Sequence, residues 1–194
     1  MTAEVARRES ARLANPTRRV VAFTGLAGSG KSTAALHLVN AHGWQRIRFA
    51  GPLKAMMHAL GLSDREIDGD LKEQSCDLLC GQTPRHAMQW LGTEWGRNLI
   101  GRDVWIRAWR AAVKRTLPGS CIVVDDCRFP NEAIAVAGLG GKLVRIDRTG
   151  AGVGAAGHES ESHQLPADFT ISNNGSIAEL LGAVDYIFRS TDTP

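Results

Sequence analysis

The sequence predicts an α/β domain in which a five-stranded parallel sheet carries helices on both faces, giving three layers. Short apolar runs of strand length alternate with helical patterns along the chain, as is typical of parallel sheets. A glycine-rich loop joins the first of these strands directly to the first helix. The length of 194 residues and the hydrophobic content of 43% suit one compact domain, which we expect over residues 19–190.

The chain begins its structured part with a strand, a loop, a helix and a second strand. Residues 19–24 form an apolar run of the kind that makes a buried strand. We expect a helix over residues 31–42, because Gly43 stands where helices commonly end. Residues 45–50 alternate arginine with apolar residues, which predicts the second strand.

The rest of the chain divides into a helical stretch and three further strand patterns. Residues 52–117 are helical in pattern, with breaks at glycine and proline. Strand patterns follow at residues 121–125, 142–147 and 168–172. A helix is expected near Asn131, and a last helix at Ser176, where Ser176 and Glu179 fit a capping box.

Charge and hydropathy limit the partners of the chain. Residues 1–19 hold five arginines and two glutamates, which accounts for the net charge of +3 and leaves the remaining chain balanced. Nucleic-acid binders usually carry a basic folded surface, so we expect no stable nucleic-acid partner. Residues 1–18 are expected to be a flexible basic tail, and an organellar presequence is the alternative, which the two glutamates disfavour. No apolar run approaches the ~20 residues that span a bilayer, so no membrane partner is expected.

The cysteines and histidines give little support for a metal site. Four cysteines form no CxxC pair, and no signal peptide is evident, which predicts reduced thiols in a cytoplasm. Cys76 and Cys80 are four residues apart, a spacing that could share a metal on a helix, but two small buried side chains are the favoured interpretation. His158 and His163 stand five residues apart, whereas a HExxH zinc motif needs four.

The stretch GLAGSGKS matches the phosphate-binding pattern GxxxxGK[ST] in full, between a strand and a helix. Its glycines let backbone N–H groups converge on phosphate oxygens, and the helix start adds positive dipole. Lys31 is expected to reach the β- and γ-phosphates of ATP, and Ser32 to ligate Mg²⁺. A plain turn would explain the glycines but not the Lys-Ser pair. The residues expected to bind ATP here are Gly25, Gly28, Ser29, Gly30, Lys31, Ser32 and Thr33.

An acidic pair ends the strand predicted at residues 121–125. In phosphate-loop enzymes a carboxylate at the end of a neighbouring strand belongs to the Mg²⁺ shell. Either Asp125 or Asp126 could supply it, and we take Asp125 with Ser32 as the candidate metal ligands. A solvated acidic turn is the alternative interpretation.

Missing motifs narrow the class of nucleotide enzyme. No Asn-Lys-x-Asp motif for reading a guanine base occurs, which disfavours a switch GTPase. A chain of 194 residues leaves little room for the helical lid domain of an AAA-type motor. A small kinase fits better, and a kinase needs a second surface that binds the acceptor.

The segment after Pro84 offers such a surface. Four of its residues share one stripe of a 3.6-residue helix: Arg85, Gln89, Gly92 and Gly96. Each interior glycine costs about 1 kcal/mol relative to alanine, so a ligand lying against the backbone would explain them. Arg85 would pair with a phosphate and Gln89 with a base edge, although a plain solvent-facing stripe is an equal alternative. The opposite side is expected to be buried: Ala87, Met88, Trp90, Leu91, Trp95 and Leu99.

A set of motifs covers nearly all of residues 20–188: FAGPLK, LKEQ, TPRHAMQWLGTEWGR, DVW, VVDDCRFPNEA, GKLVRIDR, HESE and DFTISNNGSIAEL. Together they resemble the deoxynucleoside monophosphate kinases of tailed bacteriophages. The resemblance implies the P-loop nucleoside monophosphate kinase fold, a helical acceptor-binding lobe at residues 52–117, and the reaction dNMP + ATP → dNDP + ADP. For a phage-encoded protein it also implies the host cytoplasm, and it leaves open whether the chain forms a homodimer.

The resemblance also implies roles for residues at matching positions. Acceptor-site candidates are Lys54, Arg85, Gln89, Trp90, Glu94 and Arg97. Asp125, Asp126 and Arg128 are catalytic-strand candidates, in addition to Lys31. The last third is similar also to dephospho-CoA kinases, which are the enzymatic alternative. An ATP-binding module that handles DNA is the alternative from another class, and the balanced charge disfavours it.

The loop expected to act as a lid departs from the pattern of adenylate-kinase-like enzymes. Residues 149–166 would form it, yet the segment contains no lysine or arginine. Arg148 or Arg145 at the preceding strand end, or Arg128, must then supply positive charge to the transferring phosphoryl group. Asn174, after the last strand, is expected near the adenine of ATP, and a plain turn is the alternative.

Overall fold

The computed structural model describes residues 18–152 and 165–191, which form two compact units. The first unit comprises the described residues of Met1–Arg48 and Val113–Pro194, and the second is Phe49–Ala112. None of the described helices combines the length and apolar character that a membrane span needs.

Some predicted features lie outside these ranges. They are nearly all of the basic tail, most of the lid loop, and the pair His158 and His163.

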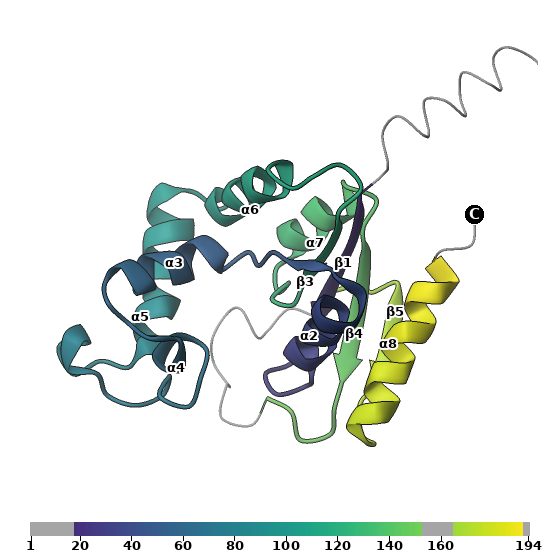
Figure 1. The fold of residues 1–194 in the computed structure, drawn as a ribbon. Coiled ribbons are helices and arrows are strands. Elements are labelled where there is room, and N and C mark those ends of the chain that lie inside the picture. The colour runs from purple at the N-terminus through teal and green to yellow at the C-terminus, as the bar shows by residue number, and fades with distance from the viewer. Residues whose placement is uncertain (1–17, 153–164, 192–194) are drawn as a thin grey trace, which may run out of the picture. The chain divides into compact units, whose positions relative to one another are not determined.

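The first unit is built on a five-stranded sheet in which every pairing is parallel (Figure 1). Its strands are β1 (Arg19–Thr24), β2 (Gln45–Arg46), β3 (Cys121–Val124), β4 (Lys142–Asp147) and β5 (Phe169–Ser172). Their order across the sheet is β2-β3-β1-β4-β5. The carboxyl ends of β1, β3 and β4 therefore meet at one edge, which is where α/β proteins bind ligands.

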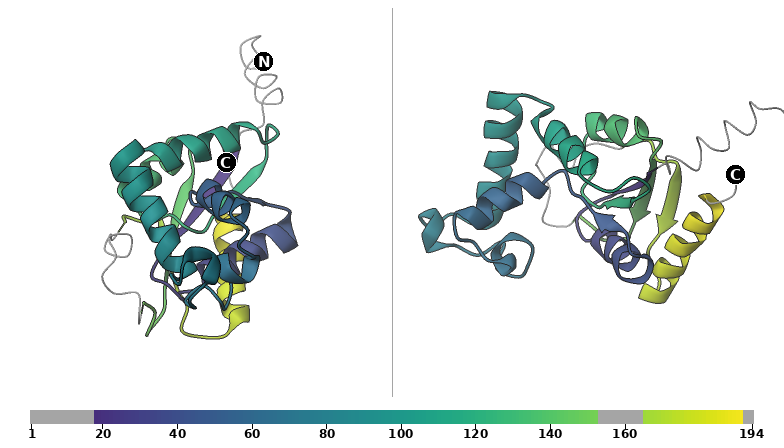
Figure 2. Two further views of the ribbon diagram at one scale, coloured as in Figure 1. Left: turned by 90° about the vertical axis from the view of Figure 1, so that its left-hand side faces the viewer. Right: turned by 45° about the horizontal axis from the view of Figure 1, so that its top comes forward.

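Helices cover both faces of this sheet, which confirms the predicted fold class (Figure 1, Figure 2). Helices α2 (Lys31–His42) and α8 (Ile177–Thr191) lie on one face, and α7 (Pro130–Ala137) lies on the other. Val21 and Phe23 of β1 point into a core shared with α2 and α8. Their neighbours Val20 and Ala22 are also buried, because alternate side chains of a strand face opposite sides and both sides are covered.

The predicted helix ends of this unit are confirmed. Gly43 ends α2 in the left-handed conformation, with φ 69°, and its N–H donates to the carbonyl of Val39 at 3.1 Å. Before α8, the Ser176 N–H donates to Glu179 Oε2 at 2.7 Å, and the Glu179 N–H donates to Ser176 Oγ at 3.3 Å. Both exchanges satisfy backbone groups that a helix end leaves without a partner.

The strand predicted over residues 45–50 is too long. Strand β2 contains only Gln45 and Arg46, although the Ile47 N–H still donates to the carbonyl of Val123 on β3. Phe49 belongs to the second unit, where its ring lies 4.7 Å from that of Trp109. Burial against Trp109 therefore decides the position of Phe49, and the alternating pattern alone could not show this.

The second unit is helical. Its elements are α3 (Gly51–Ala59), α4 (Asp64–Ile67), the 3₁₀ turn η1 (Asp77–Leu79), α5 (Pro84–Trp90), the π-helix η2 (Leu91–Ile100) and α6 (Val104–Lys114), whose last residues belong to the first unit. The core of the second unit is a cluster of apolar side chains: Leu53, Met57, Leu62, Ile67, Met88 and Trp105.

Candidate active site

The phosphate loop needs glycine at two positions for reasons that the structure makes explicit. Gly25 has φ +136°, and a Cβ there would lie 2.3 Å from the carbonyl oxygen of Ile146. Gly30 has φ +108°, and its Cβ would lie 2.5 Å from the side-chain nitrogen of Asn173. Both backbone angles lie in a region that other residues rarely adopt. The loop thus reaches α2 in a conformation that leaves the first N–H groups of the helix unused by side chains.

Lys31, the first residue of α2, places its ammonium group at the loop. Its Nζ donates to the carbonyls of Gly25 at 2.7 Å and Leu26 at 2.6 Å, and lies 3.5 Å from Ser29 Oγ. Only 8% of Lys31 is exposed, so its charge is concentrated where the loop amides converge. Thr33 lies in the same first turn and is exposed. A phosphate chain is the class of ligand that this arrangement suits.

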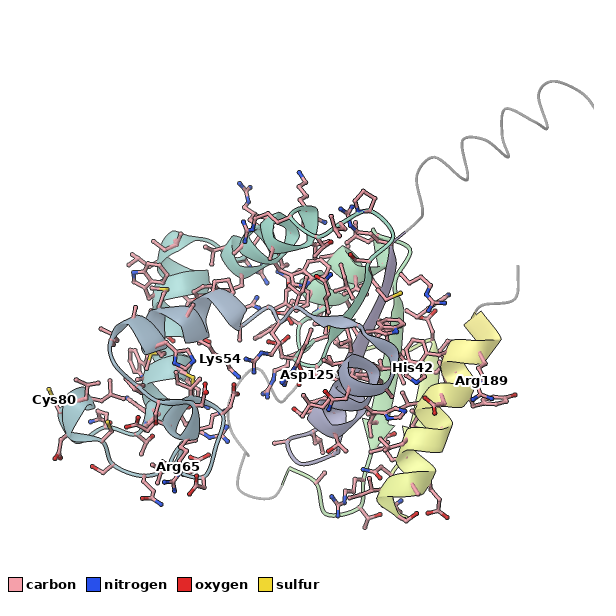
Figure 3. All side chains as sticks on the ribbon, viewed as in Figure 1. His42, Lys54, Arg65, Cys80, Asp125 and Arg189 are labelled. Atoms are coloured by element: carbon pink, nitrogen blue, oxygen red, sulfur yellow. The ribbon has the colours of Figure 1, made fainter. Side chains whose placement is uncertain are left out.

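Asp125 follows β3 and joins the phosphate loop to the sheet (Figure 3). Ser32 Oγ donates to Asp125 Oδ2 at 2.8 Å. Arg46, at the end of β2, binds the same carboxylate through two nitrogens, with Nε 2.9 Å from Oδ1. The predicted pair Ser32 and Asp125 is therefore brought together, and a cation from a third element lies beside it.

The surroundings of Asp125 set its protonation. Burial alone would raise the pKa of this carboxyl, since only 4% of the residue is exposed. The hydrogen bonds and charge of Arg46 oppose burial, Ser32 and Arg48 add to that effect, and the pKa lies below its usual value. Asp125 is thus ionised at neutral pH, as a metal ligand must be.

The residues after Asp125 lead into α7. Asp126 and Arg128 are half-buried, and Cys127 is buried. Glu132 caps the helix by accepting the N–H groups of Arg128 at 2.8 Å and Phe129 at 3.1 Å. Burial, together with the charges of Glu132 and Asp126, holds the pKa of the Cys127 thiol well above its ordinary value, so the thiol is unreactive. Catalytic roles for Asp126 and Arg128 stay predictions.

Two neighbouring asparagines after β5 have different surroundings. Asn173 is buried, and its side-chain amide donates to the carbonyl of Ser29 at 2.8 Å, so it fastens the phosphate loop. Asn174 is exposed and accepts the Thr149 N–H at 2.7 Å, while its amide donates to Ser172 Oγ at 3.1 Å. Asn174 thus ties the ends of β4 and β5 together. Its expected contact with adenine stays a prediction.

Arg145 in β4 and Arg148 just after this strand have different surroundings. Arg145 donates to the carbonyl of Leu165, so its guanidinium is already engaged. Arg148 lies just past β4 and is exposed. Among the described residues, Arg148 is therefore better placed than Arg145 to meet a ligand.

Lys54 and Arg85, the predicted cations of the acceptor site, both carry carboxylate partners within the second unit. Lys54 on α3 pairs with Asp68, and Arg85 on α5 pairs with Glu73. The N–H of Arg85 also donates to the carbonyl of Lys72 at 3.0 Å. These pairs hold both cations in fixed positions.

The other acceptor candidates lie along α5 and η2. Gln89 is half-buried, and Trp90 is 58% exposed. Glu94 accepts the side-chain amide of Asn98 at 3.0 Å, and Arg97 donates to a backbone carbonyl five residues later at 3.4 Å. Their roles in binding stay predictions.

Comparisons with known proteins place the chain in a family. No protein-family model matches it. A curated protein of Acanthamoeba polyphaga mimivirus, named "Putative deoxynucleotide monophosphate kinase", is 33% identical over 180 residues, which are 85% of this chain and 93% of the relative. The chain belongs to the deoxynucleotide monophosphate kinase family. It is accordingly a kinase, a phosphotransferase that acts on nucleotides.

Solved structures confirm the fold of this kinase. The Mycobacterium tuberculosis APS kinase CysC, in complex with AMPPNP and APS, superposes with a TM-score of 0.52 at 16% identity, over 92% of this chain and 99% of that one. TT1252 from Thermus thermophilus superposes with a TM-score of 0.50 at 14% identity, over 92% of this chain and all of that one. At such identities the likeness concerns the fold alone.

The predicted buried face of the acceptor helix is wrong in part. Met88 is buried, but Trp90, Trp95 and Leu99 are 58%, 38% and 72% exposed. The helix changes from α to π winding after Trp90, so beyond that point a periodicity of 3.6 residues wrongly assigns Trp95 and Leu99 to the core. The change does not explain the exposure of Trp90, which ends the α-helical part.

The glycines of that helix lie close against other groups, as expected, but these groups are side chains of the kinase itself and not a ligand. A Cβ on Gly96 would lie 2.5 Å from the indole of Trp105, whose Nε1 donates to the carbonyl of Gly92 at 2.8 Å. A Cβ on Gly92 would meet Leu53 at 3.2 Å. Gly92 and Gly96 therefore serve packing within the second unit.

Cys76 and Cys80 are not the pair of buried side chains that we expected. Cys80 is exposed and has φ 55°, and Cys76 is half-buried, with its thiol 3.3 Å from Glu66 Oε1. They flank the short turn η1 and do not share a helix face. All four cysteines are free in the structure.

Sequence reasoning missed Arg46 and Asn173. Arg46 was assigned to an alternating strand, although an arginine at a carboxyl-terminal strand edge is a candidate partner for Asp125. Asn173 precedes the residue expected near adenine, and its side-chain amide holds the glycine-rich loop through the carbonyl of Ser29.

Proposed function

We propose that this kinase transfers the γ-phosphoryl group of Mg-ATP to a deoxynucleoside monophosphate, which gives a deoxynucleoside diphosphate and ADP. The observation that carries this proposal is the meeting of Lys31, Ser32 and Asp125 at the start of α2. The mimivirus relative supports the choice of acceptor through its name.

The chemistry requires little from the protein beyond alignment and positive charge. A nucleoside monophosphate is mostly dianionic at neutral pH, because its second pKa is about 6, so its oxygen attacks without a general base. The bond from the γ-phosphorus to the bridging oxygen of ATP breaks as the bond to the acceptor oxygen forms. Lys31 and the loop amides would bind the donor phosphates, and Arg128 and Arg148 would add charge near the transferring group.

The residues at the loop fit a magnesium ion. Mg²⁺ prefers oxygen ligands, and Ser32 Oγ and the Asp125 carboxylate offer both hydroxyl and carboxylate oxygen. These two residues would hold the ion, which when bound neutralises charge on the phosphates. Arg46 keeps the carboxylate ionised and fixes its orientation.

The acceptor would be bound by the second unit. Arg85 would take the monophosphate in a two-pronged contact, with Lys54 as a second cation and Gln89 facing the base. Trp90, Glu94 and Arg97 would complete the surface. The exposure of Trp90 supports this assignment, since a wide aromatic face on the surface can stack on a base.

A substrate panel tests the proposal. The full-length kinase is mixed with Mg-ATP and, in turn, each common ribo- and deoxyribonucleoside monophosphate, dephospho-CoA, or DNA, and ADP release is followed. We expect turnover with one or more deoxynucleoside monophosphates and none in Lys31→Ala. Turnover with dephospho-CoA alone would overturn the proposed acceptor. ATP hydrolysis that rises with DNA and ignores mononucleotides would overturn the kinase reaction itself.

A further inference from the structure

Two histidine rings of α2 and one carboxylate of α8 lie together where these helices pack. One of the three residues, His42, is labelled in Figure 3. His37 Nε2 and His42 Nε2 each lie 2.8 Å from Asp185 Oδ1. The rings stand edge to face, with centroids 5.3 Å apart. The three possible ligand atoms all lie within 4.8 Å of one another, so three electron-pair donors converge on one place.

The backbone beneath this cluster is fixed, and its surface is open to water. Leu38 of α2 is buried in the same core as Val184 and Phe188 of α8, so the two helices cannot slide freely. The side chains of His37, Asp185 and His42 are 16%, 28% and 41% exposed. An ion can therefore enter, and water can complete its coordination.

We propose that His37, His42 and Asp185 bind one divalent transition-metal ion of the zinc class, at a site separate from the nucleotide loop. Two imidazoles and a carboxylate suit Zn²⁺, Co²⁺ or Ni²⁺, whereas Mg²⁺ prefers oxygen ligands alone. A tetrahedral ion with bonds of about 2.0–2.1 Å sets its ligand atoms roughly 3.3 Å apart. The 2.8 Å contacts would thus open by about half an ångström, and the two histidine nitrogens, within 4.8 Å of each other, would also have to settle near roughly 3.3 Å.

The carboxylate of Asp185 is already in the charged form that a metal ligand needs. Burial would raise the pKa of Asp185, but the hydrogen bonds and charges of His37 and His42 outweigh it, and the pKa lies below its usual value. The carboxylate is therefore charged at neutral pH. A bound ion needs each imidazole neutral, with its Nε2 lone pair on the metal and its remaining proton on Nδ1.

An ion here would act on the nucleotide helix. Helix α2 begins with Lys31 and Ser32 at the phosphate loop, and α8 is the last helix of the described chain. A ligand that binds only the folded form stabilises it by mass action. The ion would fasten α8 to the helix that carries the loop, and the melting temperature would rise with its concentration.

The test measures zinc binding by the full-length chain after chelator treatment, with calorimetry and thermal unfolding near neutral pH. We expect one tight site per chain and a rise in Tm with zinc. Asp185→Asn and His42→Ala should each weaken zinc binding at least about 10–100-fold, the loss typical of residues that only support a ligand, and remove the rise in Tm. The matched control is His58→Ala, because His58 also lies beside an aspartate, with its Nε2 3.4 Å from Asp64, but has no second histidine. It should bind zinc as the wild type does.

A variant of the most exposed residue of the cluster distinguishes loss of zinc binding from loss of folding. His42 is 41% exposed, so His42→Ala should keep the wild-type metal-free Tm and can carry the test if Asp185→Asn unfolds. In the wild type, zinc should also shift the NMR signals of the His37 and His42 rings. No zinc binding, or binding that stays unchanged in both variants, would overturn the proposal.

Discussion

The glycines of the phosphate loop and those of the acceptor helix are needed for different reasons within one chain. Gly25 and Gly30 have backbone angles that other residues avoid, and they touch the sheet and the asparagine behind it. Gly92 and Gly96 lie in a helix and make room for Leu53 and Trp105. In the first region glycine is required by the backbone conformation of the loop, whereas in the second it makes room for side chains in the interior of the protein.

The difference teaches which glycines point to a ligand. In the loop, the spacing to Lys31 and Ser32 carries chemistry that no packing requirement explains. In the acceptor helix, a glycine stripe that contains Arg85 and Gln89 resembled a binding face, yet an indole from α6 fills the space. The following predictions test the two regions in turn, from the largest expected effect to the smallest.

Lys31→Ala should remove phosphoryl transfer and leave the fold intact. The ammonium group is the concentrated positive charge of the loop, and loss of such a group in a transition state costs about 10³-fold or more in kcat. ADP release measures turnover, and circular dichroism measures folding. The control is Lys142→Ala, which should retain activity. It removes an exposed lysine of β4 that pairs with Asp168. Normal turnover in Lys31→Ala would contradict the assignment of the loop.

Asp125→Asn should lower kcat by about 10²-fold and weaken the response to Mg²⁺. It also leaves Arg46 without its ion-pair partner, which we expect to cost about 2 kcal/mol, less than for a fully buried pair because 25% of the Arg46 side chain is exposed.

The pH dependence of stability gives a second readout for Asp125. Its pKa is lowered in the folded kinase, so it stabilises the fold above its unfolded pKa of about 3.9. That contribution is lost as the pH falls through the folded pKa. Urea unfolding at a series of pH values should show a smaller loss on acidification in Asp125→Asn, and identical pH profiles would contradict the pairing.

Arg85→Ala should raise the KM for the monophosphate by about 10-fold and leave the KM for ATP within about twofold. The reason is that Arg85 is assigned to the acceptor alone. Arg65→Ala is the matched control, because Arg65 lies in the same unit and is likewise paired with a carboxylate, that of Asp70. Equal effects of Arg85→Ala on both KM values would place the acceptor phosphate elsewhere.

Gly96→Ala and Gly182→Ala should change stability in opposite directions. A Cβ on Gly96 would overlap Trp105, which we expect to destabilise the second unit by about 1–3 kcal/mol. Gly182 lies exposed in α8 with nothing within 4 Å, so alanine there should stabilise by roughly 0.5–1 kcal/mol through helix propensity. Denaturant unfolding of both variants provides the comparison. Unchanged stability of Gly96→Ala would mean that this face of the helix is not filled by Trp105.

Local sequence patterns predicted the first unit well, because its elements are determined by residues that are close together in the sequence. The strand before the loop, the bounds of α2, its glycine cap and the capping box of α8 each depend on a few adjacent residues. The meeting of Ser32 with Asp125 followed from the rule that parallel strands end at the same edge.

The parts that could not be predicted depend on contacts distant in sequence. Phe49 left the expected strand because Trp109 buries it, and the switch to π winding after Trp90 changed which side chains face the core. Histidine spacing is subject to the same limit, and the pair His158 and His163 lies outside the described residues. A separation of five residues argued against a metal at His158 and His163, yet His37 and His42 on α2 have that separation and still meet at Asp185, because a second helix, α8, supplies the carboxylate that both contact.

Hydrogen–deuterium exchange of the full-length kinase tests most directly whether donor and acceptor are bound by different regions. We predict that AMPPNP with Mg²⁺ slows exchange at residues 25–33, and that an accepted deoxynucleoside monophosphate alone slows it at residues 84–97. Protection of both segments by either nucleotide alone, or of neither segment by the monophosphate, would contradict the division of labour proposed for this kinase.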